Sequence, residues 1–547
     1  MRRKIVVPAE FQRRTGIRRT EVFPSGPGTL EEAMDWPRFI IDALLQGADG
    51  SADESLLMRV QMNLRQRNVV VTDYSGWDCP QWCFHAMIAA FRNHLQWEPS
   101  MLSEAFNFAR ACDFGPVQNR VLTAISHQHH KSSMCVHSNM IHRLPRKARR
   151  HIERELPPPD ASVDTRRDAY SAIALWLLEN RQWVFPADAK AECSTHGKQC
   201  FANGIMWVPE DQRESPDRPS IWNISGLTCH AWSAEGKGEG LAHESALYHG
   251  IWHAERIALA EASQEDGFFF ECTPLFPVRE LIRDRFAKTH FCFWVIVDPL
   301  WQGYPSRRRR VLCFCGNRKT LFWTGAETNE LFMQDFHRRF SRTVVLAGSS
   351  LMCDTESNRW AAYRDIAMRR GHDLTVQELE DMPVDDMTDL IGPPGFGQRL
   401  AEWSSFHQAN VGAPGYMADC DHHPVVGRNA GGMTWPVQLT HGTIVCFGGG
   451  GPHDWRMATA KEHMVAQGFH AVPAASSSLH PVCPLADILD QLQVSSKDVK
   501  KLSGNGMSLI TQSSFMMCIF ANVVRRDSVG ASVEEGITAD LPADDWG

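Results

Sequence analysis

Cys229 is the residue of this sequence whose surroundings best suit a nucleophile. It lies in the segment 220–237, SIWNISGLTCHAWSAEGK, where an apolar strand pattern ends at Gly226 and a polar loop begins. Loops at the carboxyl ends of strands line the ligand crevice of open α/β sheets. A thiolate there could attack carbon and form a covalent intermediate. A structural cysteine is the competing interpretation, because the chain has 16 cysteines.

Charged side chains at two further strand patterns could act beside this thiol. Glu271 ends the apolar run Phe268–Phe270, where a carboxylate is costly to bury unless it is paired or used. Four arginines, 307–310, lead directly into an apolar strand pattern. Alternate side chains of a strand share a face, so Arg308 and Arg310 are expected to point inward together. A solvated arginine face and an ion pair with Glu271 are the structural alternatives.

The apolar pattern predicts the scaffold that would hold these groups. Residues 68–73, NVVVTD, predict a buried strand, Tyr74-Ser75-Gly76 a turn, and 82–97 a helix, which is the ligand edge of a doubly wound sheet. Further strands are expected at 220–225, 267–271, 291–297 and 310–315, and helices at 36–47, 168–180 and 247–262. We therefore predict an α/β fold with a mostly parallel sheet.

Composition and charge narrow the class of protein. Hydrophobic residues make up 43% of the 547 residues and charged residues 22%, which excludes a disordered chain or a coiled coil. The net charge of −8 means that nucleic-acid binding would need local patches, such as 307–310 or the basic arm 2–19. No apolar run approaches the roughly 18–20 residues that span a bilayer, and no secretory signal is evident. A nuclear or cytoplasmic location with reduced cysteines is expected.

Five segments, taken in order, resemble the cytosine-C5 DNA methyltransferases, which use S-adenosylmethionine. GLTCHAWSAEGKGEG is similar to the catalytic cysteine loop of that family, FFFECT to its glutamate strand, and YPSRRRRVLCF to its Arg-x-Arg segment. RMATAKEHMVAQGF resembles the late Arg-x-x-Thr-x-x-Glu segment that ends in Gln-Gly-Phe, and GNGM resembles the final Gly-Asn motif. Five segments in the family's order are more specific than any one of them. The resemblance covers 68–320 and 421–526.

The resemblance implies a Rossmann-like methyltransferase fold with a smaller, irregular target-recognition domain. The implied divisions are a basic arm and helix at 1–67, a catalytic core at 68–317 with an insertion at about 150–219, a target-recognition region at 318–420, a return to the core at 421–526 and an acidic, disordered tail at 527–547.

The resemblance also implies methylation of cytosine C5 in duplex DNA, on a base flipped out of the helix. Cys229 would add to C6, Glu271 would act at N3, and Arg308 and Arg310 would hold the pyrimidine O2 or a phosphate. The positions that match the family's cofactor motifs would bind S-adenosylmethionine: Tyr74, Ser75, Gly76, Trp77, Asp113, Asn139, Asn505 and Gly506.

Several positions depart from the family pattern. Asp78 stands where the cofactor turn has its second glycine, Thr228 where proline precedes the cysteine, and Cys272 where asparagine follows the glutamate. These departures favour one alternative, an inactive relative that binds DNA or a protein partner. A second alternative is an RNA cytosine-C5 methyltransferase of the same fold.

Two groups of possible metal ligands lie outside these motifs. Cys193, His196 and Cys200 have a spacing near that of a zinc knuckle, but the sequence indicates no fourth ligand, so a polar loop is favoured. The second group is a His-rich stretch: His127, His129, His130, Cys135, His137 and His142. That stretch is expected to lie around the cofactor strands. No metal is predicted at either.

Overall fold

The computed structural model describes most of the chain. The described residues are 23–46, 54–97, 106–203, 215, 218–233, 238–424, 431–448, 454–477 and 480–528. The basic arm, all but the first two residues of the acidic tail, and Lys237 of the cysteine loop lie outside them. Within these ranges, none of the helices combines the length and the apolar character needed to cross a membrane.

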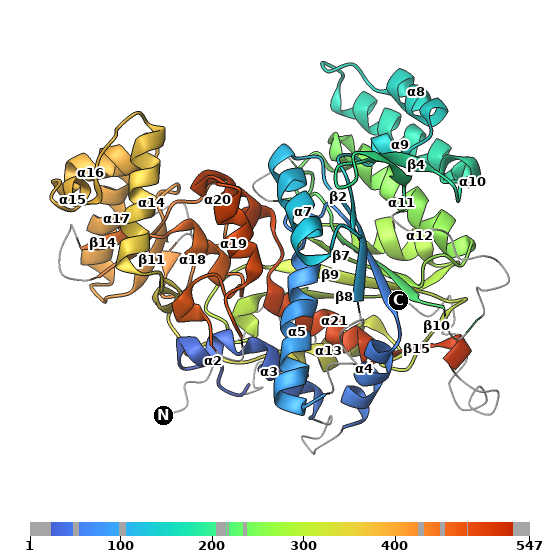
Figure 1. Ribbon diagram of the computed structural model, residues 1–547, viewed down its shortest axis with the longest axis horizontal. Coiled ribbons are helices and arrows are strands. Elements are labelled where there is room, and N and C mark those ends of the chain that lie inside the picture. Colours follow the sequence, from blue (N-terminus) through green and yellow to red (C-terminus); the bar gives the residue numbers. More distant parts are fainter. Residues whose placement is uncertain are drawn as a thin grey trace.

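A central sheet organises the larger lobe (Figure 1). Its strands are β1 (Asn68–Asp73), β2 (Phe106–Cys112), β3 (Cys135–His137), β6 (Ser220–Gly226), β7 (Gly267–Cys272), β8 (His290–Val297) and β9 (Arg310–Asn317). Their order is β3-β2-β1-β6-β7-β9-β8. The first five are parallel, and β9 runs antiparallel to both of its neighbours. This order, with one reversed strand next to the edge, is the Rossmann-like methyltransferase fold, as the sequence predicted.

Consecutive residues of these strands point to opposite faces of the sheet, and each face has its own hydrophobic core. In β7, Phe269 packs on one face of the sheet, while Phe268 and Phe270 pack on the other. In β8, Phe291 and Phe293 likewise face away from Cys292. Each strand therefore contributes apolar side chains to both faces, which explains the continuous apolar runs in the sequence.

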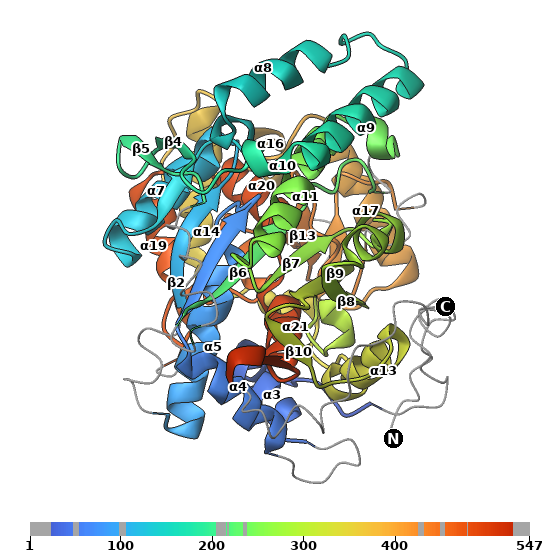
Figure 2. The same cartoon turned by 90° about the vertical axis from the view of Figure 1, so that its right-hand side faces the viewer.

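Helices cover both faces of the sheet (Figures 1 and 2). The first layer is α3 (Trp36–Leu44), α4 (Ser55–Arg65), α5 (Cys79–Leu95), α7 (Pro116–His129), α13 (Asn329–Phe340) and α21 (Leu509–Phe520), whose apolar residues share one core. The second layer is α9 (Val163–Glu179), α11 (Ser245–Glu261) and α12 (Asp284–Phe286). The short α2 (Leu30–Met34) precedes α3.

The segment between β3 and β6 forms an insertion of helices and a hairpin. It consists of α8 (Arg146–Glu155), α9, α10 (Arg181–Val184), β4 (Lys190–Cys193) and β5 (Lys198–Phe201). Ile173 and Leu177 of α9 pack on α11, so the insertion belongs to the second helical layer. Figure 2 shows α8 and α9 projecting beyond the sheet.

A smaller lobe follows α13 along the chain. It contains α14 (Glu356–Arg369), α15 (Val376–Glu380), α16 (Val384–Ile391), α17 (Phe396–Asn410) and the antiparallel strands β11 (Tyr416–Asp419), β12 (Gly431–Gly432), β13 (Ile444–Phe447) and β14 (Trp455–Met457). Its two small cores draw on residues from Tyr363 to Met457. The smaller lobe does not coincide with the range 318–420 that was predicted for the target-recognition region. At its start, Phe332 and Phe336 of α13 pack in the main core, and at its end the lobe continues beyond residue 420 to β14.

The last part of the chain returns to the larger lobe. Helices α18 (Ala460–Val465), α19 (Pro484–Gln491) and α20 (Ser496–Asn505) lead to α21. The final strand, β15 (Val523–Arg525), pairs antiparallel with β10 (Leu321–Trp323). Segments about 200 residues apart in sequence therefore close the same lobe.

Candidate functional site

The turn after β1 has a strained backbone. Tyr74, Gly76 and Asp78 have φ angles of 54°, 60° and 60°, in the left-handed region. For non-glycine residues this conformation costs about 1–3 kcal/mol and is typical of ligand-binding turns. A Cβ at Gly76 would meet nothing within 4 Å, so the turn presents open space at its apex.

Hydrogen bonds join the carboxyl ends of β1, β2 and β3. Ser75 N donates to the Cys112 carbonyl at 3.2 Å, and Gly76 N donates to Oδ2 of Asp113 at 2.9 Å. Asp113 N in turn donates to the His137 carbonyl at 3.2 Å. Burial raises the pKa of Asp113, and backbone N–H donors oppose that shift. The predicted cofactor residues Ser75, Gly76 and Asp113 thus meet at one edge of the sheet.

The predicted aromatic residues of the turn differ in exposure. Tyr74 is half-buried beside His249 of α11, with ring centroids 6.1 Å apart, and its buried hydroxyl has no hydrogen-bond partner among the described residues. Trp77 is fully buried against Phe469, so its indole packs on protein instead of facing the crevice. Phe114, which sequence analysis did not select, is 72% exposed directly after Asp113. Its position directly after Asp113, the acid at the end of a predicted strand, is the sequence feature that could have identified Phe114.

Asp78 is a buried carboxylate at the start of α5. Neither of its oxygens has a hydrogen-bond partner by distance and angle among the described residues, although the Thr72 hydroxyl lies close enough to lower its pKa. Burial outweighs that influence and raises the pKa to about 7. Its left-handed backbone is the conformation that a glycine at this position would favour.

Cys229 lies three residues beyond the end of β6. Leu227 N donates to the Glu271 carbonyl at 3.0 Å, which extends the pairing of β6 and β7 toward the cysteine loop. The Cys229 carbonyl accepts bonds from Trp232 N at 2.9 Å and Ser233 N at 2.8 Å, so the loop turns tightly after the thiol. Cys229 is partly exposed, whereas the neighbouring Cys272 is fully buried.

Glu271 lies next to both arginines that the sequence selected. Arg310 Nε is 2.8 Å from a Glu271 carboxylate oxygen, and an Arg308 guanidinium nitrogen is 3.9 Å from it. Arg308 also donates to the Gly504 carbonyl at 3.1 Å. Burial and the charge of Arg310 lower the pKa of Arg308 to about 10, so it remains a cation at neutral pH. Arg308 and Arg310 therefore point inward, as the alternation predicted.

A buried ionic network supports the β1 end of this edge. Arg110 donates to Asp73 at 2.7 Å, and Arg143 pairs with both Asp73 and Glu255 at 3.2 and 3.0 Å. Burial alone would raise the pKa of Glu255, but Arg143 and the arginines around it lower that pKa to about 2. Asp73 is the residue before Tyr74, so the network fixes the base of the turn after β1.

The late motifs pack behind the turn. Glu462 caps α18 through Thr459 and pairs with Arg456 at 2.5 Å, which gives the Arg-x-x-Thr-x-x-Glu pattern a structural role. The Gly-Asn motif lies between two helices: Asn505 ends α20, and α21 begins at Leu509. Asn505 is exposed, and a Cβ at Gly506 would lie 2.8 Å from the Trp77 indole nitrogen.

The histidines of the His-rich stretch do not gather. His127 contacts Ser132, and His130 contacts Gln81. Asn139, two residues beyond the end of β3, accepts a hydrogen bond from Ile141 N at 2.9 Å. Cys135 instead joins the other candidate group, beside Cys193, His196 and Cys200. Cys135 therefore supplies a fourth potential ligand that the sequence did not indicate for Cys193, His196 and Cys200.

Comparison with known proteins gives distant structural counterparts. No family model matches it, and no curated protein does. Similar solved structures include a DNMT2 variant of Spodoptera frugiperda, the Dnmt2 methyltransferase of S. pombe and the methyltransferase EhMeth of Entamoeba histolytica, with TM-scores of 0.34, 0.37 and 0.39. Each is 10% identical over 83% of this chain, and 99%, 98% and 98% of their own chains are covered. At such TM-scores the likeness carries no argument, and the fold assignment rests on strand order.

Proposed function

We propose that the chain is an S-adenosylmethionine-dependent methyltransferase that acts on cytosine C5 in DNA through a covalent Cys229 adduct. The observation that supports this most strongly is the position of three groups in the fold. The Cys229 loop leaves β6, Glu271 ends the neighbouring β7, and Arg310 begins the reversed strand β9. A nucleophile, a carboxyl group and a cation thus stand at one sheet edge.

The chemistry of cytosine explains why these groups would be needed together. C5 is too weak a nucleophile to accept a methyl group unaided. Addition of the Cys229 thiolate to C6 breaks the C5–C6 double bond and places the electron pair on C5. A hydrogen bond from Glu271 at N3 would stabilise the charge that develops on the ring. After methyl transfer, loss of the C5 proton to a base restores the double bond and expels the thiolate.

Arg308 and Arg310 would position the substrate and the carboxyl group. Arg310 holds Glu271 through its Nε and donates from Nη1 to the Arg309 carbonyl, so Nη2 would be the nitrogen offered to the pyrimidine O2 or a phosphate. Arg308 is 3% exposed and tied to Gly504, so it is better suited to fixing local geometry and supplying positive potential.

The residues at the β1–β3 edge fit S-adenosylmethionine. Asp113 accepts backbone N–H groups from Gly76 and Gly115, with Phe114 N–H close by, and its two oxygens offer about four lone-pair sites, so it retains acceptor capacity for a ribose hydroxyl. The exposed Phe114 offers an apolar face for an adenine, and the Tyr74 hydroxyl is a buried polar group in need of a partner. Bound there, the cofactor supplies the methyl group. Ser75, Gly76 and Asn139 shape the same edge.

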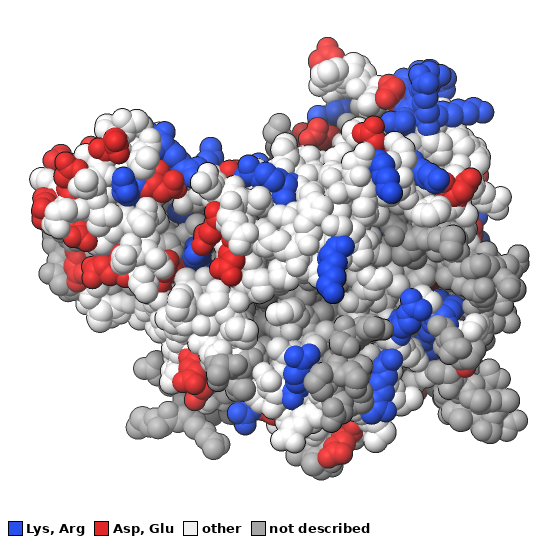
Figure 3. Space-filling view, in the orientation of Figure 1, with Lys and Arg blue, Asp and Glu red and all other residues white. Residues whose placement is uncertain are grey.

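A basic surface near this edge could contact the phosphate backbone. Figure 3 shows Lys and Arg gathered over α8, and Asp and Glu gathered over the smaller lobe. Arg146, Lys147, Arg150 and Arg154 of α8 are exposed. Because α8 begins nine residues after β3 ends, this surface lies close to the cofactor edge in sequence. Local charge of this kind would let an acidic protein bind DNA.

The proposal is tested by methyl transfer from tritiated S-adenosylmethionine to genomic DNA or to transfer RNA, followed by nucleoside analysis. Label in 5-methyldeoxycytidine that Cys229→Ser abolishes would support it. Label found only in RNA would overturn DNA as the substrate and support the RNA cytosine-C5 methyltransferase instead. No incorporation into either, combined with no calorimetric binding of the cofactor, would support an inactive binding protein and overturn the proposal.

A further inference from the structure

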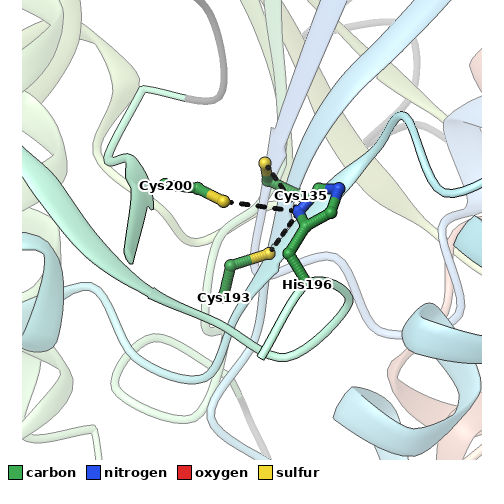
Figure 4. A group of neighbouring side chains, drawn as sticks. All are labelled: Cys135, Cys193, His196 and Cys200. Atoms are coloured by element: carbon green, nitrogen blue, oxygen red, sulfur yellow. Dashed lines mark hydrogen bonds between the residues drawn. The ribbon is translucent and has the colours of Figure 1, made fainter. Parts of the chain in front are cut away.

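Four side chains that the proposed reaction does not use converge at the edge of the main sheet (Figure 4). Cys135 comes from the edge strand β3, while Cys193, His196 and Cys200 come from the β4–β5 hairpin of the insertion. The four potential ligand atoms all lie within 4.8 Å of one another. Residues some 60 positions apart in sequence therefore form one compact group of three thiols and one imidazole.

The distances within the group match a tetrahedral metal site. The Nδ1 atom of His196 lies 3.2 Å from the sulfur of Cys193, 3.3 Å from that of Cys200 and 3.7 Å from that of Cys135. Zinc bonds of about 2.3 Å to sulfur and 2.0–2.1 Å to nitrogen would place these atoms roughly 3.6 Å apart. These three nitrogen–sulfur distances would need only about tenths of an ångström of adjustment to hold one ion between them.

The orientation of His196 provides a second, independent argument. Its Nε2 lies 2.7 Å from the Ser132 carbonyl, which can only accept a hydrogen bond, so Nε2 carries the proton. Nδ1 faces the three sulfurs and is therefore the ring nitrogen that is free to bind a metal. Metal-bound histidines are typically held in this way by a carbonyl behind the ring.

The hairpin backbone is shaped to present these ligands. Gly197 has φ +59°, and its N–H donates to the Cys193 carbonyl at 2.9 Å, which closes a tight turn between the two hairpin cysteines. Ser194 N donates to the Val136 carbonyl at 2.8 Å, which docks the turn on β3 next to Cys135. Backbone hydrogen bonds alone therefore align the hairpin with β3.

A disulfide explains the group less well. A disulfide bond between two of these sulfurs would not account for the third thiol or for the imidazole that faces the sulfurs. Another sulfur group, Cys292, Cys313 and Cys315, is fully buried in β8 and β9 and includes no imidazole or carboxylate. Mixed thiolate and imidazole ligands in a tetrahedron favour zinc over harder ions.

We propose that Cys135, Cys193, His196 and Cys200 bind one zinc ion that fastens the insertion to the edge strand of the sheet. Four protein ligands leave no open position, so the ion is structural and not catalytic. Its place on β3 puts it two residues from His137, whose carbonyl is bonded to Asp113. Zinc would therefore stabilise the same edge that carries the candidate cofactor residues.

The full chain, purified under reducing conditions, should carry about one zinc per chain by inductively coupled plasma mass spectrometry. Replacement by Co²⁺ should give the intense visible absorption of a tetrahedral thiolate site. Cys200→Ser, at the least buried thiol of the group, should lose most of the zinc while circular dichroism shows a folded chain. Cys446→Ser, a half-buried cysteine in β13, is the matched control and should keep the zinc.

The role in stability is tested by removing the metal. A strong chelator should lower the Tm of the wild-type chain by at least about 5 °C, and added Zn²⁺ should restore it. The Cys200→Ser chain should show no further chelator effect. Wild-type protein without zinc that also takes up no Co²⁺ would overturn the proposal, as would full zinc content in Cys200→Ser.

Discussion

Arg310 Nε lies 2.8 Å from a carboxylate oxygen of Glu271, where the antiparallel strands β7 and β9 meet. The pair is only slightly exposed, and the Arg308 guanidinium nitrogen lies 3.9 Å from the same oxygen. Two cations thus surround one carboxyl group next to the loop that carries Cys229. This arrangement orients the carboxyl group and supplies positive potential to whatever enters beside it.

Removing the ionisable group of Glu271 should reduce the rate of methyl transfer. Glu271→Gln keeps the shape of the side chain but removes its capacity to donate or accept a proton, so kcat should fall about 10²–10⁴-fold. The control is Glu280→Gln, which alters an exposed carboxylate on the following helical turn and should leave kcat unchanged. An unaltered kcat in Glu271→Gln would remove this residue from the mechanism.

Cys272 should be dispensable despite its position next to Glu271. The thiol is fully buried, and burial together with the nearby Cys229 and Glu271 raises its pKa well above the usual value. It therefore stays a neutral thiol and cannot attack a base. Cys272→Ala should form the covalent DNA adduct in the same yield as the wild-type chain. Loss of the adduct in a folded Cys272→Ala chain would mean that Cys229 is not the sole nucleophile.

Asp78 should make stability fall as pH rises. Because burial raises its folded-state pKa from 3.8 to about 7, the native state keeps a proton that the unfolded chain loses between these values. The free energy of unfolding should therefore decrease from pH 4 to pH 7 by up to about 4 kcal/mol from this group. Asp78→Asn, which also tolerates the left-handed backbone, should unfold like the wild-type chain at pH 4 and be more stable at pH 8.

Chemical denaturation at both pH values provides the measurement for Asp78. Asp160→Asn, at an exposed aspartate of the insertion, is the control and should change stability at neither pH. An Asp78→Asn advantage that is equal at pH 4 and pH 8 would show that the effect does not come from the titration of this carboxyl group.

The buried network beneath the β1 turn should be important for stability. Glu255→Ala would remove a buried carboxylate that pairs with Arg143 and Arg110. Removing one partner of a buried ion pair typically lowers the free energy of unfolding by about 3–5 kcal/mol. On the same helix, Glu261→Ala breaks an exposed pair with Arg181 and should cost at most about 1 kcal/mol. Urea unfolding of the two variants gives the comparison, and equal losses would contradict a special role for the buried network.

The fold could be predicted from sequence where apolar runs are continuous. Asn68–Asp73 and His290–Val297 are buried strands, because residues facing each side of the sheet are covered by helices. The limit of the smaller lobe could not be predicted in this way. The apolar side of α13 would suit either lobe, and only the tertiary structure places Phe332 and Phe336 in the main core.

The candidate site shows the same division. Alternation along a strand predicted that Arg308 and Arg310 point the same way, since that property is local. The burial of Trp77 against Phe469 depends on a segment about 390 residues later, and no local pattern contains it. Likewise, Cys135 joins the hairpin cysteines only because the insertion folds back on β3.

The most direct measurement is covalent trapping of the full chain on duplex DNA that contains 5-fluorocytosine, in the presence of S-adenosylmethionine. Fluorine at C5 cannot leave as a proton does, so the thiol stays bonded to C6 after methyl transfer. We predict an adduct that resists denaturation, whose peptide linkage maps to Cys229 and which Cys229→Ser does not form. A wild-type chain that binds cofactor and DNA yet forms no adduct, or one linked through another residue, would contradict the account.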